Sequence, residues 1–277
     1  MTVSLVLRRA SERIGASVGL DAIEAAIEAR ALLCAALDVD RVWLIVHAQD
    51  ELEAPNLHEF EKMVERRLKG EPVAYIAGFR EFYGAKFRVT RDVLIPRPET
   101  ELLVDLALEC MPEDGKVLDL GTGSGAIAVS IARLRKSAAI CAIDKSPAAL
   151  EIAKENGRDL PNIDYVESDW FEALPGEKYD LIVSNPPYIA EGDEHLKDLQ
   201  FEPSLALTSG RDGLDAIRRI VQDAPSHLKA GGWLLFEHGY DQGGKCRKLL
   251  SKKFYEVATW RDLSGNDRVS GGRLTSA

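Results

Sequence analysis

Hydrophobic residues in the first part of the chain recur at helical spacing. Asp21 followed by Glu24 has the pattern of a helix-capping box, and Asn56 with Glu59 repeats it. The apolar positions after each signal return every three or four residues, so each set shares one helical face. They are Ile23, Ile27 and Ala31 in the first segment and Leu57, Phe60, Val64 and Leu68 in the second. We therefore predict a small helical domain over residues 1–72.

Residues 73–95 carry a different pattern, in which aromatic and β-branched residues cluster around Gly78 and Gly84. This pattern predicts short strands or a hairpin, which we expect to link two domains. The chain then enters Leu94–Glu101, where two prolines bracket Arg97 and stiffen the backbone. That segment is either a helix entry with acidic residues in its first turn or a rigid edge of an active site.

From residue 96 onward, strand-like and helical patterns alternate. Apolar runs predict strands at 117–120, 139–143, 163–166, 179–183 and 233–236, and helices at 126–133 and 147–156. Such alternation is typical of a parallel sheet with helices on both faces, and ligands bind such sheets at the carboxyl ends of the strands. We therefore predict an α/β domain over residues 96–277, with functional residues directly after strands.

Composition and charge narrow the class of protein. The 277 residues are 45% hydrophobic and 29% charged, as in ordinary globular proteins, and the formal net charge is −10. An acidic chain without a basic arm argues against direct binding to nucleic acid. The sequence contains no apolar run of about 18 residues, so we predict no membrane span. The charged N-terminus lacks the apolar core of a secretory signal, so we predict a cytoplasmic location and no membrane partner.

Cysteine and histidine are too scattered to predict a metal site. The cysteines form no C-x-x-C pair, and the histidines show no H-E-x-x-H spacing. The cysteines are Cys34, Cys110, Cys141 and Cys246. We predict no metal and interpret the cysteines as free thiols in a reducing environment.

A glycine-rich turn joins the first predicted strand to the next helix. It reads Gly121-Thr122-Gly123-Ser124-Gly125, which is neither a dinucleotide fingerprint nor a P-loop. Glycines allow a sharp turn and close approach to a ligand. Asp144 ends the following strand, where a carboxylate can accept hydrogen bonds from both ribose hydroxyls. Together these features predict a cofactor that contains a nucleoside.

The third predicted strand ends at Ser168-Asp169-Trp170. Asp169 could accept the exocyclic amine of an adenine, and Trp170 could pack on its ring. Alone, Trp170 would be interpreted as a core residue. With the glycine turn and Asp144, however, the three strand ends outline a slot for adenosine.

The fourth predicted strand is followed by Asn185-Pro186-Pro187-Tyr188. The prolines stiffen the backbone and lack N–H donors, so their carbonyls and the Asn185 carbonyl form a rigid set of acceptors for an –NH₂ group. Tyr188 offers a flat face to a planar amide or base. The arrangement suits methyl transfer to a planar, weakly nucleophilic nitrogen, for which orientation supplies much of the rate. These four residues are the predicted catalytic and substrate-binding residues, and Asn185 is also expected to contact the cofactor.

With these motifs in place, the chain resembles S-adenosylmethionine-dependent methyltransferases that modify planar amino nitrogens. From about residue 70 to the C-terminus it is similar, more narrowly, to the release-factor glutamine methyltransferases of the HemK/PrmC type. The additional matching segments are Glu71–Gly78, Phe82–Gly84, Leu94–Glu101, Phe201–Pro203, Gly210–Leu214 and Asp262–Arg268.

The resemblance implies a seven-stranded, Rossmann-like methyltransferase sheet with a small N-terminal helical domain that helps to grip the substrate. It implies methylation of the side-chain amide nitrogen (N5) of the glutamine in the Gly-Gly-Gln motif of class I peptide-chain release factors. S-adenosyl-L-methionine would be the methyl donor and S-adenosyl-L-homocysteine the product. The resemblance assigns Gly121–Gly125, Asp144 and Trp170 to the cofactor, and Asn185–Tyr188 to the glutamine amide.

Three alternatives stay open at this stage: a ribosomal-protein glutamine methyltransferase, a nucleic-acid amino methyltransferase, and a non-catalytic module that keeps the cofactor slot. Ser168 stands where relatives often have glycine, and His238 where an apolar residue is expected. We interpret His238 as a tolerated substitution rather than a base. Asp119, at the end of the first strand, could contact the glycine turn or simply brace it.

Overall fold

The computed structural model describes residues 1–275 and shows two compact units, Met1–Phe79 and Arg80–Ala277. Each unit has its own hydrophobic core. The first unit ends seven residues beyond the predicted helical domain, which we had placed at residues 1–72. Within residues 1–275, no helix is long and apolar enough to cross a membrane, and no group of His, Cys, Asp or Glu side chains could hold a metal ion.

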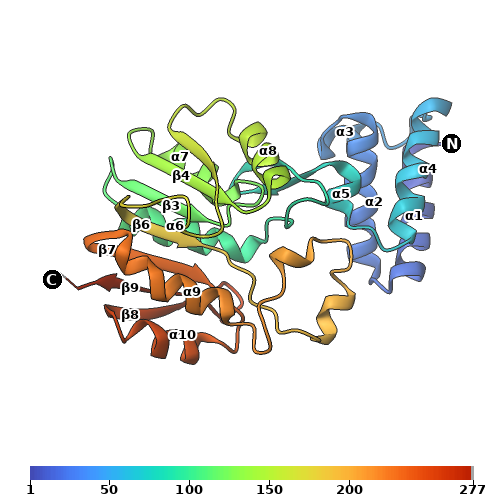
Figure 1. Cartoon of the computed structure of the whole chain (residues 1–277). Coiled ribbons are helices and arrows are strands. Elements are labelled where there is room, and N and C mark those ends of the chain that lie inside the picture. Colours follow the sequence, from blue (N-terminus) through green and yellow to red (C-terminus); the bar gives the residue numbers. More distant parts are fainter. Residues whose placement is uncertain (276–277) are drawn as a thin grey trace. The chain divides into compact units, whose positions relative to one another are not determined.

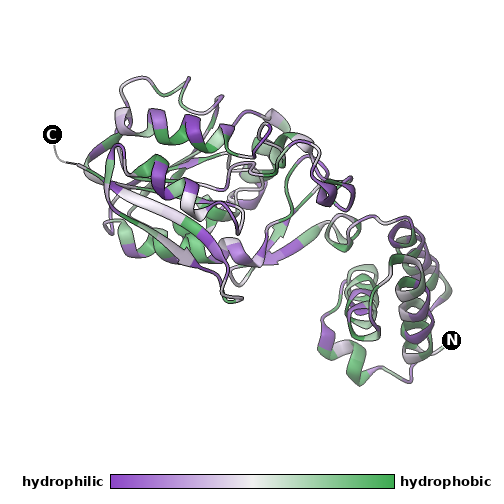
Figure 2. Ribbon diagram, turned by 90° about the horizontal axis from the view of Figure 1, so that it is seen from below, coloured by the Kyte–Doolittle hydropathy of each residue, from purple (hydrophilic) through white to green (hydrophobic). Residues whose placement is uncertain are grey.

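Helices build the first unit, and hydrophobic and hydrophilic residues alternate along them (Figure 2). They are α1 (Val3–Val18), α2 (Ala22–Leu37), α3 (Arg41–Val46), α4 (Ala54–Leu68) and α5 (Val73–Ala77). The predicted capping box of α2 is confirmed, because the Asp21 carboxylate accepts the backbone N–H groups of Ile23 and Glu24, both at 2.8 Å. Phe60 and Val64 of the predicted apolar stripe are fully buried in the core of this unit.

Two details of this unit differ from the prediction. Helix α4 begins at Ala54 rather than after Asn56, because Pro55 in the first turn is compatible with helix from its first residue onward. On α2 the side chains of Ile23 and Ile27 are 73% and 51% exposed. The buried positions of α2 are instead Ala25, Ala29, Leu32 and Leu33. Small alanines allow α1 to pack closely against α2 there. The size of the residues, rather than their hydrophobicity, therefore decided which face of α2 is buried.

The segment predicted as a hairpin-like linker contains both a helix and a hairpin. Residues 73–77 form α5, which Gly78 ends in a left-handed conformation with φ of 82°. The strand prediction was therefore wrong for Tyr75 and Ile76. Strands β1 (Phe79–Phe82) and β2 (Ala85–Arg88) then pair as a two-stranded sheet.

A seven-stranded mixed sheet forms the second unit (Figure 1). Its strands are β3 (Lys116–Leu120), β4 (Ala139–Asp144), β5 (Ile163–Glu167), β6 (Tyr179–Ser184), β7 (Leu228–Glu237), β8 (Phe254–Arg261) and β9 (Asp267–Leu274). The strand order is β5-β4-β3-β6-β7-β9-β8, so the chain moves outward from β3 in one direction and later from β6 in the other. The carboxyl ends of β3 and β6 therefore flank the switch point, where open α/β sheets bind ligands.

Side chains alternate between the two faces of this sheet, as expected for strands. On β6, Leu181 and Val183 belong to the core cluster on one face and Ile182 to the cluster on the other. Helices α6 and α7 contribute to the first cluster, whereas α9 and α10 contribute to the second. The helices of this unit are α6 (Glu101–Cys110), α7 (Ala126–Leu134), α8 (Pro147–Asn156), α9 (Asp215–Asp223) and α10 (Gly243–Leu250), with short 3₁₀ turns at Pro98–Thr100, Glu194–Lys197, Ser204–Ala206 and Ala224–Ser226.

The five predicted strands are all present, and β3, β4, β5, β6 and β7 pair in parallel. The last two strands are different, because β9 pairs antiparallel with both β7 and β8. The hydropathy pattern did not predict this pair; only the family resemblance implied seven strands. Gly271 and Gly272 interrupt the apolar alternation of β9, which hides it from a pattern search.

Candidate active site

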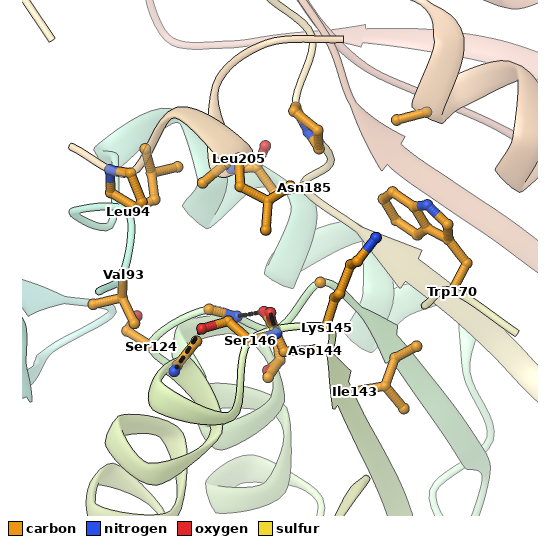
Figure 3. Close-up of a pocket in the computed structure, with 18 of the residues that line it drawn as sticks. Val93, Leu94, Ser124, Ile143, Asp144, Lys145, Ser146, Trp170, Asn185 and Leu205 are labelled. Atoms are coloured by element: carbon orange, nitrogen blue, oxygen red, sulfur yellow. Dashed lines mark hydrogen bonds between the residues drawn. The ribbon is translucent and has the colours of Figure 1, made fainter. Parts of the chain in front are cut away.

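A cavity of about 450 Å³ lies at the carboxyl ends of β3, β4, β5 and β6 (Figure 3). Ser124 and Asp144 lie on one side of it, Asn185 and Leu205 lie opposite, and Trp170 and Val93 are at its two ends (Figure 3). Most of the predicted site residues line this cavity: Gly121, Thr122, Gly123, Ser124, Asp144, Asp169, Trp170, Asn185 and Pro187. Gly125, Pro186 and Tyr188 are not part of its lining. The sheet thus brings together residues from four separate strand ends.

The glycine turn after β3 adopts a conformation that other residues rarely adopt. Gly121, Gly123 and Gly125 have φ values of 72°, 56° and 79°. At Gly125, an added Cβ would lie 3.1 Å from the Cβ of Ala153, so helix α8 leaves no room for a side chain. An added Cβ at Gly123 would meet nothing within 4 Å, because this glycine faces open space. The turn therefore brings bare backbone to the cavity.

Asp119 braces this turn from below. Its side chain is fully buried, and one carboxylate oxygen accepts the Thr122 hydroxyl at 2.7 Å and the Ala128 backbone N–H at 3.2 Å. Within the described residues, its other oxygen (Oδ1) has no hydrogen-bond partner. Burial raises the pKa of this carboxyl from 3.8 to about 7. Of the two roles predicted for Asp119, bracing is the one that these contacts support.

The raised pKa of Asp119 predicts a pH-dependent stability. The folded protein holds this proton more tightly than the unfolded chain does. Protonation of Asp119 therefore adds to the free energy of unfolding, and this contribution is fully present below pH 3.8 and is lost as pH rises through about 7. The slope approaches about 1.4 kcal/mol per pH unit. Asp119→Asn removes this titration, so its stability relative to the wild type should improve between pH 4 and pH 8. Denaturant unfolding of both proteins across this range is the measurement, and parallel curves would contradict the assignment.

Asp144, the last residue of β4, connects the turn to the next helix. Its two carboxylate oxygens accept the backbone N–H groups of Gly123 at 2.8 Å and Ser146 at 2.9 Å. Burial raises its pKa, and these hydrogen bonds counteract the rise. Each carboxylate oxygen can accept a second hydrogen bond. Asp144 is therefore held rigidly with free acceptor capacity toward the cavity.

The end of β5 carries the predicted adenine residues in a tight turn. Trp170 has a left-handed backbone with φ of 55°. Ser168 stabilises this turn, because its hydroxyl donates to the Trp170 carbonyl at 2.8 Å and accepts the Ala173 N–H at 3.0 Å. Serine at this position therefore makes two hydrogen bonds that glycine could not make.

The Asp169 carboxylate is paired with two cations at the rim of the cavity. Lys145 and Arg219 donate to its two oxygens at 2.7 and 2.8 Å, and the Lys145 hydrogen bond, above all, lowers its pKa. An adenine amine at this site would share the carboxylate with these two side chains. Neither cation was predicted from the sequence.

The Asn185–Tyr188 segment leaves β6 at the switch point. Asn185 and Pro187 line the cavity, whereas Pro186 is buried and Tyr188 is half-buried outside the lining. The backbone carbonyl of Tyr188 accepts the Gln242 amide at 3.0 Å. The segment is therefore fixed at its far end, as expected of a rigid set of acceptors.

Two residues that were not predicted from the sequence adjoin this segment. The Asn185 side-chain amide donates to the Thr100 hydroxyl at 3.1 Å, and Thr100 donates to the Glu237 carboxylate at 2.6 Å. The Tyr188 hydroxyl donates to the other Glu237 oxygen at 3.1 Å. Glu237 ends β7, so the rule that functional residues follow parallel strands could have found it.

His238 lies next to Glu237 but takes no part in the cavity. It is fully buried, and its ring nitrogens contact the Gly239 carbonyl and the Ser270 hydroxyl, both at 2.8 Å. Burial lowers its pKa. These contacts support the interpretation of His238 as a structural substitution.

The rest of the cavity wall is largely apolar. Val93, Leu94 and Pro96 contribute one part, and Pro203 and Leu205 another. The two segments are joined by Glu202, which is buried, accepts the Ile95 backbone N–H at 3.1 Å and pairs with Arg97. The predicted rigid edge at Leu94–Glu101 is thus tied in place by a carboxylate more than a hundred positions later in the chain.

A sheet of this topology with a glycine turn, a strand-end acid and an N-P-P-Y segment around one cavity defines a methyltransferase. Family models agree: "PrmC N-terminal domain" matches residues 6–78 and "Methyltransferase small domain" matches residues 99–200. The chain is 50% identical over 254 residues to a release factor glutamine methyltransferase of Xylella fastidiosa, which covers 89% of this chain and 92% of that protein. Proteins of the same name from Neisseria gonorrhoeae (48% identity, 89% and 93% coverage) and Vibrio cholerae (44%, 99% and 97%) also match. The chain belongs to the release factor glutamine methyltransferase family.

Solved structures support the fold alone. A methyltransferase from Pyrococcus furiosus aligns with a TM-score of 0.54 and 17% identity, covering 78% of this chain and 100% of that one. The 16S rRNA N2 G1207 methyltransferase of T. thermophilus aligns with a TM-score of 0.52 and 21% identity, covering 71% and 49%. The seven-stranded methyltransferase sheet is therefore confirmed.

Proposed function

We propose that this protein transfers a methyl group from S-adenosylmethionine to the side-chain amide nitrogen (N5) of the glutamine in the Gly-Gly-Gln motif of class I peptide-chain release factors. The observation that carries the proposal is the position of Asn185 and Pro187 on the wall of the same cavity as the glycine turn and Asp144. Similarity to release factor glutamine methyltransferases over about nine-tenths of the chain supports the choice of substrate. Translation factors are cytoplasmic substrates, so we place the reaction in the cytoplasm.

The residues around the cavity fit S-adenosylmethionine. Asp144 keeps free acceptor capacity for ribose hydroxyls, and the open side of Gly123 leaves space for close approach. Trp170 offers an aromatic face, and Asp169 beside it is an acceptor for the adenine amine. When bound, this cofactor supplies an electrophilic methyl group on a positively charged sulfur.

Asn185, Pro186 and Pro187 would hold the glutamine amide in place. The Asn185 carbonyl and the proline backbone carbonyls accept hydrogen bonds but offer no competing N–H. The two hydrogens of a primary amide can therefore be held while its nitrogen faces the methyl group. Tyr188, which lies outside the cavity lining, would keep this segment itself in position through its contacts with Gln242 and Glu237. Orientation of this kind supplies much of the rate, and no strong base is needed beforehand because the alkylated nitrogen becomes acidic.

The helical unit, residues 1–72 in the sequence prediction, would add contacts to the release factor. We propose a recognition role for this unit, supported by the match of "PrmC N-terminal domain" to residues 6–78. Residues 96–277 would then carry the cofactor and the chemistry.

A methyl-transfer assay with labelled S-adenosylmethionine tests the function directly. Purified release factor, the same factor with its Gly-Gly-Gln glutamine replaced by alanine, and bulk ribosomes are supplied in parallel. Label is expected on the intact release factor only. Label on ribosomes instead would assign the protein to ribosomal-protein or rRNA methylation. Cofactor binding without transfer to any substrate would favour a non-catalytic module.

A further inference from the structure

We propose that Thr100 and Glu237 are positioning residues for methyl transfer, and that their hydrogen bonds fix how the Asn185 carboxamide faces the substrate. The inference rests on the proposed function, because it assigns these residues a part in holding the glutamine amide. It concerns a chain of contacts that joins four segments of the second unit: the turn before α6, the end of β6, Tyr188 and the end of β7.

The direction of each hydrogen bond follows from the number of protons available. A threonine hydroxyl has a single proton, and Thr100 donates it to Glu237 over 2.6 Å. The hydroxyl can therefore only accept from Asn185. The Asn185 atom that faces Thr100 at 3.1 Å must then be the –NH₂ nitrogen and not the carbonyl oxygen. The carbonyl oxygen of Asn185 is left for another partner, which is the role that the substrate amide requires.

Glu237 fixes the ring of Tyr188 in the same way. Its second oxygen accepts the Tyr188 hydroxyl at 3.1 Å. One carboxylate is thus linked to both ends of the Asn185–Tyr188 segment, directly at Tyr188 and through Thr100 at Asn185. An ionised carboxylate is the only common side chain that accepts on both oxygens and donates from neither. When Glu237 is ionised, it therefore sets the direction of every hydrogen bond in this series of contacts.

Burial protects the hydrogen bonds of Thr100 and Glu237 from competition by water. Glu237 is 1% exposed and Thr100 is 4% exposed, so water does not compete for their hydrogen bonds. Burial raises the pKa of Glu237, and the Thr100 hydrogen bond and the nearby charge of Arg268 counteract this rise. The guanidinium of Arg268 is in turn paired with Asp262 at 3.1 Å. A buried acid with this support is costly to maintain, which is consistent with a role beyond packing.

Substitutions at position 100 separate the hydroxyl from the shape of the side chain. Thr100→Val keeps the shape and removes the hydroxyl, whereas Thr100→Ser keeps the hydroxyl. We expect Thr100→Val to lower kcat about 10- to 100-fold, and Thr100→Ser to retain most of it. The KM for release factor and the Kd for S-adenosylmethionine should change little in both variants.

A double-mutant cycle with Asn185→Ala distinguishes positioning from a general structural role. If Thr100 acts through Asn185, Thr100→Val should cost less than about twofold once Asn185 is already alanine. A merely structural defect would lower kcat by the same factor in both backgrounds.

Substitutions at position 237 provide an independent readout. Glu237→Gln can still present its carbonyl to Thr100, whereas Glu237→Met presents no acceptor, so kcat should fall in the order wild type, Glu237→Gln, Glu237→Met.

The outcomes separate this inference from the proposed function. Wild-type protein that methylates no release factor would overturn both. Wild-type activity together with an equally active Thr100→Val, or with a Thr100→Val effect that persists in full in the Asn185→Ala background, would overturn the positioning role alone.

Discussion

Replacing Asn185 with alanine is expected to lower methyl transfer to release factor by about 10²- to 10³-fold. The variant loses the carbonyl that would hold the substrate amide, and it also leaves the Thr100 hydroxyl without its 3.1 Å donor. The loss should appear in kcat, because the interaction is needed to align the nitrogen with the methyl group rather than to bind the release factor as a whole. Single-turnover kinetics with labelled S-adenosylmethionine is the measurement.

Cofactor binding is the control for Asn185→Ala. The Kd for S-adenosylmethionine should stay within about threefold of the wild type, since the contacts proposed for adenosine lie on other strand ends. Gln222→Ala, which removes an exposed carboxamide on α9, serves as the matched surface variant and should be fully active. An Asn185→Ala protein with undiminished turnover would exclude the role proposed for this side chain.

Replacing Asp144 with alanine is expected to weaken S-adenosylmethionine binding by about 100-fold. The substitution removes the acceptors proposed for the ribose, and hydrogen bonds to an ionised carboxylate are each worth about 1.5–3 kcal/mol. It also frees the Gly123 and Ser146 N–H groups, which Asp144 now holds at 2.8 and 2.9 Å, so the glycine turn itself should loosen. Isothermal titration calorimetry of the purified variant gives the Kd directly.

Asp164→Ala is the matched control for this experiment. Asp164 lies on the neighbouring strand β5 and is exposed, outside the lining of the cavity. Its replacement removes one carboxylate from the same sheet without touching the proposed ribose site. Equal Kd values for wild type, Asp164→Ala and Asp144→Ala would show that Asp144 does not bind the cofactor.

Residues with a local physical role were predictable from the sequence. Asp21 caps α2 because its side chain reaches the N–H groups two and three residues later, a contact that depends on spacing alone. The glycine turn, Asp144 and Asn185 were located by the same kind of reasoning, since each directly follows a strand of the parallel sheet.

Contacts between distant parts of the chain were not predictable in this way. Thr100 and Glu237 are 137 positions apart and meet only because α6 packs beside β7. Arg219, which pairs with Asp169, lies on α9, and no spacing rule connects the two. On α2, Ile23 was assigned to the buried face by hydrophobicity, but the packing of alanines against α1 decided which face was buried. Local patterns thus gave the strand ends, and the tertiary fold supplied the groups that support them.

The absence of N–H donors at Pro186 and Pro187 has a consequence for the number of methyl groups transferred. Neither residue has a backbone N–H to donate, so this backbone can only accept hydrogen bonds. A nitrogen with two hydrogens can therefore make more hydrogen bonds there than a nitrogen with one. A glutamine that has received one methyl group has a single N–H left and can satisfy only one of two acceptors. The monomethylated side chain should therefore be held more weakly than the unmodified one, which favours its departure and makes a second transfer slow. Intact-mass measurement of release factor after prolonged incubation should accordingly show one added methyl group and no dimethylated species.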